Sequence, residues 1–223
     1  MDDLILRICF IGAVGSGKTR LAHFLTKNEV YIPYATLGVD FFQSTIKIND
    51  KNVKYSIWDT TGIYNLYTII RSFFKLTCAF VVITDITDAK YYTSVIDWVD
   101  NIRIKEEYKD KPIFLFCNTR GKENEYKYRI DQLTCLAEKH NLIITISDIN
   151  NKNDCIEVIK KISLYYINEL NENLKEVNKD KRNDIIRNYA RNGVIVRESY
   201  YKTDNKKISW FLKIKRYLQD KFV

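Results

Sequence analysis

Cysteine and histidine are scarce in this sequence, and their placement argues against the structures that they usually build. Among 223 residues there are five cysteines and two histidines. The cysteines are odd in number, none belongs to a Cys-x-x-Cys pair, and His23 and His140 stand alone. A disulfide framework and a zinc site are therefore both poorly supported, and we expect a reducing, cytoplasmic environment.

Signals that direct a chain into or onto a membrane are also missing. No run of about 18 apolar residues occurs, so we expect no membrane-spanning helix. The apolar run near the N-terminus has no cationic region before it, which argues against a signal peptide. Asp2 is incompatible with N-myristoylation, and the lack of any cysteine after Cys155 predicts that there is no prenyl anchor.

The net charge of +8 comes entirely from one end of the chain. Residues 1–174 carry 22 basic and 22 acidic side chains, whereas residues 175–223 carry 14 and 6. Such a distribution does not fit a uniformly basic nucleic-acid-binding surface, and we do not expect nucleic acid as the main partner. We predict a neutral domain over residues 1–174 and a basic extension over residues 175–223.

The hydrophobic pattern of the domain alternates between short β-branched runs and segments with helical spacing. This alternation is typical of βαβ units around a mostly parallel sheet. Buried strands are predicted at 4–11, 78–84, 113–117 and 142–146, and an antiparallel hairpin at 41–48 and 53–58. The pattern predicts an α/β fold with a mostly parallel six-stranded sheet, one antiparallel edge strand and helices on both faces.

A phosphate-binding motif follows the first predicted strand. Residues 12–19 read Gly-Ala-Val-Gly-Ser-Gly-Lys-Thr and match G-x-x-x-x-G-K-[ST], directly before a predicted helix. The glycines let backbone N–H groups turn onto phosphates, and the helix N-terminus adds partial positive charge. Lys18 would reach the β- and γ-phosphates, and the Thr19 hydroxyl would ligate Mg²⁺. The binding residues predicted in this loop are Gly12, Gly15, Ser16, Gly17, Lys18 and Thr19.

Later segments separate the two main classes of protein that carry this motif, the nucleotide kinases and the GTPases. Residues 36–41 (Thr-Leu-Gly-Val-Asp-Phe), the hairpin and residues 57–62 (Ile-Trp-Asp-Thr-Thr-Gly) resemble the small GTPases, and specifically the Rab branch. The resemblance extends over roughly residues 4–172. It implies a P-loop NTPase fold, GTP/GDP and Mg²⁺ as ligands, and a molecular switch in vesicle traffic or signalling that binds effector proteins and an exchange factor.

The resemblance also assigns roles to residues outside the phosphate loop. Thr36 would ligate Mg²⁺ through its hydroxyl, Asp59 would hold the ion through water, and the Gly62 N–H would contact the γ-phosphate. Tyr31 would stack on the base, and Asn118 and Ser147 would lie beside it. Effectors would read an exposed aromatic triad, for which core packing is the alternative. The members of this triad are Phe41, Trp58 and Phe74.

Two departures from the family pattern affect GTP hydrolysis. Ile63 stands where the family has the glutamine that orients the attacking water, and Val14 places a branched side chain beside the γ-phosphate. An arginine finger and the water-orienting group together supply much of the rate, so slow hydrolysis is expected, with no confident catalytic residue. Tyr64 acting in place of the glutamine is the alternative.

Two further departures affect recognition of the base. The family segment Asn-Lys-x-Asp is Asn-Thr-Arg-Gly at residues 118–121, so Gly121 cannot supply the carboxylate that pairs with guanine. Loss of two charge-assisted hydrogen bonds implies a discrimination loss on the order of 10²–10³. Glu123 could replace that carboxylate only in a remodelled loop. The family Ser-Ala-Lys segment is Ser-Asp-Ile at residues 147–149, without its lysine.

The extension contains a further predicted helix over residues 208–222. Its apolar residues fall on one face, with lysine and arginine around most of the rest. This pattern suits peripheral contact with an anionic membrane, but docking on the domain or on a partner protein or nucleic acid remains open. A short strand over residues 194–201 is also compatible with the sequence. The apolar residues of the helix are Trp210, Phe211, Ile214, Leu218 and Phe222.

Three readings of the function follow. The first is a Rab-like small GTPase that switches with guanine nucleotide and hydrolyses GTP slowly. The second is a pseudo-GTPase scaffold with lost hydrolysis and weakened guanine selectivity, which Ile63 and Gly121 favour. The third, a P-loop kinase or ATPase, would leave the match at residues 57–62 as coincidence.

Overall fold

The computed structural model describes residues 3–26, 35–63, 66–175, 177, 179–197 and 200, and every structural statement below concerns these residues. Their centre is a sheet with the strand order β2-β3-β1-β4-β5-β6, and β7 pairs with β1 as a seventh strand. The order confirms the predicted α/β fold, because β2 pairs antiparallel with β3 at one edge and the neighbours from β3 to β6 pair in parallel. The strands are β1 (Leu4–Ile11), β2 (Val39–Ile48), β3 (Lys51–Thr60), β4 (Ala79–Asp85), β5 (Ile113–Asn118), β6 (Ile143–Ser147) and β7 (Val194–Val196).

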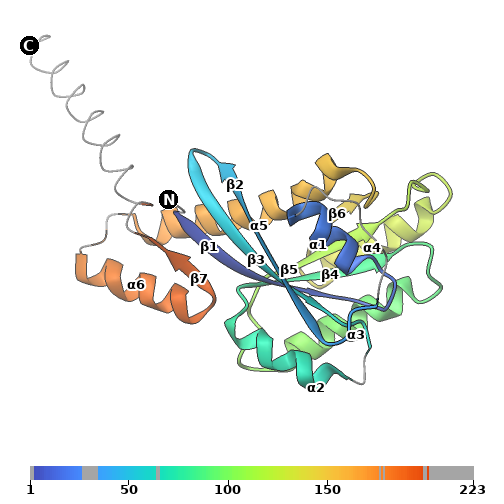
Figure 1. Cartoon of the computed structure of the whole chain (residues 1–223), viewed down its shortest axis with the longest axis horizontal. Coiled ribbons are helices and arrows are strands. Elements are labelled where there is room, and N and C mark those ends of the chain that lie inside the picture. Colours follow the sequence, from blue (N-terminus) through green and yellow to red (C-terminus); the bar gives the residue numbers. More distant parts are fainter. Residues whose placement is uncertain are drawn as a thin grey trace, which may run out of the picture.

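Helices cover both faces of the sheet (Figure 1). One hydrophobic cluster packs α1 and α5 against alternate residues of β1, β3 and β4, and a second packs η2, α3 and α4 against the opposite face. No helix among the described residues is long and apolar enough to cross a membrane. The helices are α1 (Lys18–Thr26), α2 (Tyr67–Ile70), the 3₁₀ segment η2 (Arg71–Leu76), α3 (Tyr91–Arg103), α4 (Lys127–Lys139), α5 (Lys152–Asn173) and α6 (Lys179–Arg191).

The burial of the central strands explains why their positions could be predicted from the hydrophobic pattern of the sequence. β4 and β5 are buried along their whole length, because helices cover both of their faces, and both strands are therefore continuous apolar runs. β2 lies at the edge and alternates between exposed and covered positions. Asn49 and Asp50 join β2 to β3 with φ values of 48° and 64°, the left-handed conformation that a tight hairpin turn requires.

Part of the C-terminal extension is built into the sheet. β7 pairs antiparallel with Leu4–Leu6, a stretch of β1 that β4 does not reach because its own pairing begins at Ile8. α6 and β7 therefore lie at the end of the sheet where β1 begins, opposite the phosphate-binding loop (Figure 1). The short strand expected after residue 193 is present. The division at residue 174 stays a prediction, and the predicted helix at 208–222 lies outside the described residues.

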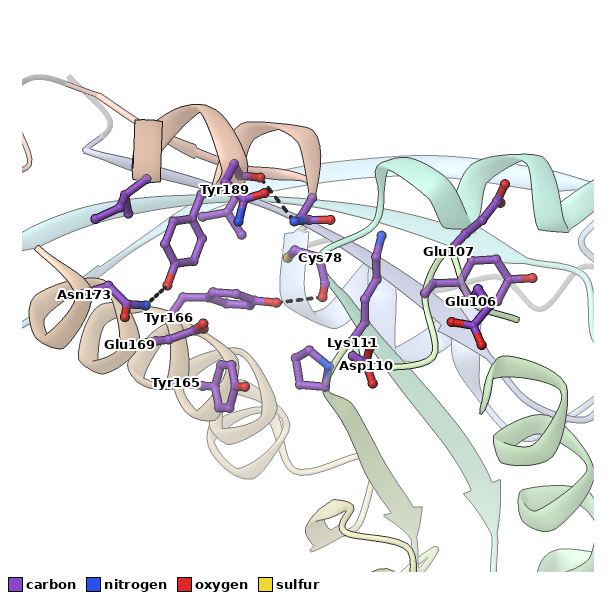
Figure 2. A pocket seen from close by; sticks show the side chains of 16 residues that line it. Cys78, Glu106, Glu107, Asp110, Lys111, Tyr165, Tyr166, Glu169, Asn173 and Tyr189 are labelled. Carbon is purple, nitrogen blue, oxygen red and sulfur yellow. Dashed lines mark hydrogen bonds between the residues drawn. The ribbon is translucent and has the colours of Figure 1, made fainter. Parts of the chain in front are cut away.

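A cavity of about 530 Å³ separates α5 and α6 from the loop that precedes β5 (Figure 2). Tyr166 on α5 donates a hydrogen bond to the Cys78 carbonyl at 2.7 Å, and Asn173 donates to the Tyr189 hydroxyl at 2.6 Å (Figure 2). The Lys111 ammonium donates to the carbonyl oxygens of η2 and of the turn that follows it. These bonds attach α6 and η2 to the body of the domain.

Candidate nucleotide-binding site

The phosphate-binding loop runs from the end of β1 to the start of α1, and its glycines occupy conformations that other residues rarely adopt. Gly12 has φ of 142° and Gly17 has φ of 105°. A Cβ atom on Gly12 would lie 2.1 Å from the Ile83 carbonyl oxygen, and one on Gly17 would lie 2.6 Å from Ile149 Cδ1. Strand β4 and the loop after β6 thus hold the motif in its curved shape.

Lys18 folds back over this loop. Its ammonium donates to the carbonyl oxygens of Gly12 at 3.0 Å and Ala13 at 2.8 Å, and the side chain is buried. Burial lowers the pKa of Lys18 to about 8, while the charge of Asp59 acts in the opposite direction. A buried ammonium that is bonded to neutral carbonyls favours a neighbouring anion, such as a phosphate.

Two hydroxyls and one carboxylate from three different segments meet beside Lys18. Thr19 Oγ1 donates to Asp59 Oδ2 at 2.6 Å and lies 2.8 Å from Thr36 Oγ1. Asp59 is fully buried at the end of β3, and burial raises its pKa to about 6. Its Oδ1 atom has no hydrogen-bond partner among the described residues. This oxygen-only donor set, with one buried oxygen unused, fits Mg²⁺.

The segment after β3 closes over the phosphate loop. A Cβ atom on Gly62 would lie 2.3 Å from the Val14 amide nitrogen, so a larger residue could not approach the loop so closely. A cavity of about 490 Å³ opens here, and Val14, Thr36 and Ile63 are among the residues that line it. Val14 and Ile63 are both exposed, and neither side chain has a polar group that could bind a water molecule.

Asn118 connects the loops at the carboxyl ends of β5 and β6. Its Nδ2 donates to the Ser16 carbonyl at 3.3 Å, and its Oδ1 accepts from the amides of Arg120 and Ile149, each at 3.3 Å. The Thr119 amide donates to the Ser147 carbonyl at 3.0 Å. The structure thus brings Asn118 to the phosphate loop and Ser147 beside the residue that follows Asn118, and their contact with the base stays a prediction.

The sequence of this chain matches a family model over most of its length. The model describes the Ras family and matches residues 7–164. The chain belongs to the Ras family of small GTPases. Proteins of this family bind GDP and GTP with Mg²⁺, hydrolyse GTP, and bind effectors and exchange factors.

The similar curated proteins are distant Rab proteins. "Ras-related protein Rab-10" of Caenorhabditis elegans is 31% identical over 101 residues, 45% of this chain and 50% of the relative. "Ras-related protein Rab-15" of Rattus norvegicus is 28% identical over 143 residues, 63% of this chain and 66% of the relative. "Ras-related protein SEC4" of Saccharomyces cerevisiae is 26% identical over 157 residues, covering 70% and 72%. The chain spans between half and two thirds of the length of the first two.

In this Ras-family chain, the aromatic residues around Trp58 are not the ones that the sequence predicted. Trp58 lies 4.8 Å from Phe41 and 5.0 Å from Phe73 between ring centres, whereas Phe74 is fully buried and packs on Phe80 at 4.9 Å. The assignment of Phe74 to an exposed triad was therefore wrong. A 3₁₀ turn rotates about 120° per residue, so consecutive phenylalanines in η2 point in different directions.

Arg120 is a site residue to which sequence reasoning gave no role. Its Nε donates to the Asp85 carboxylate at the end of β4, and its Nη2 donates to the Gly15 carbonyl at 3.2 Å. The side chain thereby spans from β4 to the phosphate loop of the GTPase domain. Arg120 occupies the variable position of the base-reading segment, and nothing in the sequence at that position indicated these two contacts. The assigned Tyr31 lies outside the described residues.

Proposed function

We propose that this Ras-family protein is a guanine-nucleotide-dependent switch, related to the Rab proteins, that hydrolyses GTP slowly. The observation that carries the proposal is the contact between Thr19, Thr36 and Asp59. Thr36 lies on the segment before β2, Asp59 lies on the last segment of β3, and Thr19 lies in the first turn of α1. One cation bound to this cluster would join both segments to the phosphate loop.

In the proposed site, Lys18 neutralises the β- and γ-phosphates, and the loop amides around Gly15, Ser16 and Gly17 bind their oxygens. Thr19, Thr36 and Asp59 would hold Mg²⁺, and the ion would neutralise part of the phosphate charge. The amide of Gly62 contacts the γ-phosphate, so loss of that phosphate releases the segment after β3. Release of the segment changes the surface that effector proteins bind.

Slow hydrolysis follows from the side chains beside the γ-phosphate position. Ile63 and Val14 have no group that can hold the attacking water in line, and an incoming arginine would have to displace the exposed Val14 side chain. The protein would therefore remain in the triphosphate state for long periods unless a partner completes the site. We propose effectors and an exchange factor as partners, in membrane traffic or signalling, with the protein cytoplasmic or at the surface of an anionic membrane.

A pseudo-GTPase scaffold is the second candidate function, because Gly121 lacks a base-reading carboxylate and Ile63 lacks a water-binding group. Nucleotide content and selectivity distinguish the two. The full chain is purified, its bound ligand is extracted and identified by chromatography, and GTP, GDP and ATP are titrated with Mg²⁺. Submicromolar guanine-nucleotide binding with exclusion of ATP supports the switch. Absence of nucleotide binding, or equal binding of ATP and GTP, supports the scaffold.

A further inference from the structure

The base-binding end of the proposed site lacks a side chain where the chemistry of guanine requires one. The guanine edge presents two neighbouring donors, the ring N–H and the exocyclic amino group, and an ionised carboxylate satisfies both. Gly121 has no side chain to offer. The inference below rests on the proposed function, since it concerns how this site would select guanine.

A carboxylate from another loop lies where the side chain of residue 121 would be. Arg120 and Gly121 have φ values of 53° and 71°, so the chain turns sharply after β5. A Cβ atom placed on Gly121 would lie 3.4 Å from Asp148 Oδ2, in ordinary contact, and no other atom of the described residues beyond the chain neighbours comes within 4 Å. The carboxylate of Asp148 therefore lies within a few ångströms of the missing one.

Neighbouring groups hold the Asp148 carboxylate in this orientation. Its Oδ1 accepts from the Asn150 amide at 2.9 Å and from Asn150 Nδ2 at 3.0 Å. Asn150 in turn accepts a hydrogen bond from Arg20 on α1. Asp148 Oδ2 accepts a single long bond of 3.3 Å from Asn150 in the described part of the chain, so it keeps capacity for a further donor.

Two charged side chains of the loop after β5, Glu123 and Arg120, are bonded to other groups. The Glu123 carboxylate accepts a hydrogen bond from the Thr119 hydroxyl and does not come within 4 Å of the Cβ position of Gly121. The Arg120 guanidinium bonds to Asp85 and to the Gly15 carbonyl, as described above. Asp148 is the acidic side chain that reaches the position.

We propose that Asp148 is the specificity-determining residue for the base and supplies from the β6–α5 loop the carboxylate that Gly121 lacks. Guanine selectivity is then retained although the base-reading aspartate is lost. Asp148 accepts from the guanine edge through Oδ2, while the bonds from Asn150 to Oδ1 fix its side chain.

The test replaces one oxygen of this carboxylate by an N–H donor. Full-length wild-type protein and the variants Asp148→Asn and Glu123→Gln are titrated with GDP, ADP and xanthosine diphosphate in the presence of Mg²⁺. Xanthine carries a carbonyl oxygen in place of the guanine amino group, so the new amide of D148N complements xanthine. We expect D148N to lose GDP affinity by about 10²–10³-fold and to bind xanthosine diphosphate more tightly than wild type. E123Q is expected to match wild type for all three ligands.

The outcomes separate this inference from the proposed function. Selective GDP binding by wild type, together with GDP affinity of D148N within about twofold of wild type, overturns the assignment of Asp148 and leaves the switch intact. Equal loss of all three ligands in D148N also overturns it, because a base-reading residue changes their ranking. Failure of wild-type protein to prefer GDP overturns the proposed function, and the inference falls with it. A gain in xanthosine diphosphate binding cannot arise from misfolding.

Discussion

Lys51 at the start of β3 is bonded to Tyr200 in the C-terminal extension. The ammonium donates to the Tyr200 carbonyl and lies 4.4 Å from the centre of its ring. The Tyr200 hydroxyl lies 2.9 Å from Asn171 Oδ1 on α5, and the side chain is almost fully buried. Tyr200 therefore joins β3 to α5 and contributes to the core of the GTPase domain.

Tyr200→Ala is expected to destabilise the whole domain. Removal of a buried aromatic side chain leaves a cavity and costs about 3–5 kcal/mol, and here it also removes the contact between the Lys51 ammonium and the ring. The measurement is the free energy of unfolding in urea, followed by circular dichroism. Tyr128→Ala is the matched control, since Tyr128 is 73% exposed on α4 and its loss should change stability by less than about 0.5 kcal/mol. Equal stability of the two variants would show that the extension adds nothing to the core.

Gly193→Ala should be more damaging than Gly38→Ala, although both glycines have positive φ. Each substitution places a Cβ in the left-handed region, which costs about 1–2 kcal/mol. At Gly193 the new Cβ would also lie 2.3 Å from the Leu76 carbonyl oxygen, whereas at Gly38 no atom of the residues that the structure describes, beyond the chain neighbours, lies within 4 Å. Thermal unfolding of both variants measures the difference. A lower midpoint for G38A than for G193A would contradict the packing of the α6–β7 turn on η2.

Phe74→Ala should destabilise the protein more than Phe73→Ala, because Phe74 lies in the core and Phe73 lies near the surface. Phe74 is fully buried among aromatic rings, so its removal is expected to cost about 3–5 kcal/mol of unfolding free energy. Phe73 is only partly covered and rests on Trp58, so its removal should cost about 1 kcal/mol. Urea unfolding of the two variants provides the comparison. A larger loss of unfolding free energy for F73A than for F74A would support the place of Phe74 in the exposed triad.

Ile63→Gln is expected to accelerate GTP hydrolysis. A glutamine amide can orient the attacking water, and positioning of a reactant to within about 1 Å is worth on the order of 10² in rate. Single-turnover hydrolysis by GTP-loaded protein measures the effect, and Ile63→Leu serves as the control that changes shape without adding a polar group. If I63Q is no faster than I63L, the apolar side chain at residue 63 is not the cause of slow turnover.

Much of the nucleotide site could be predicted because it follows from local sequence. The phosphate loop needs glycine at left-handed positions between a buried strand and a helix, and these requirements fall within eight consecutive residues. The positions of the central strands could be predicted for a similar reason, since a strand covered on both faces must be apolar along its length. The resemblance to the small GTPases assigned Thr36 and Asp59 to the Mg²⁺ site, and the hairpin between them brings the two residues together.

The sequence by itself determined the phosphate loop, the sheet and the membership of the Ras family, because each depends on neighbours along the chain. Only the tertiary structure decided that Phe73 and not Phe74 contacts Trp58, since consecutive residues of a 3₁₀ turn point in different directions, one toward the core and one toward the surface. It also decided that residues 179–197 and Tyr200 pack against the domain and that Asp148 lies beside Gly121. These contacts join segments far apart in the chain, and no local pattern encodes which distant surface a side chain meets.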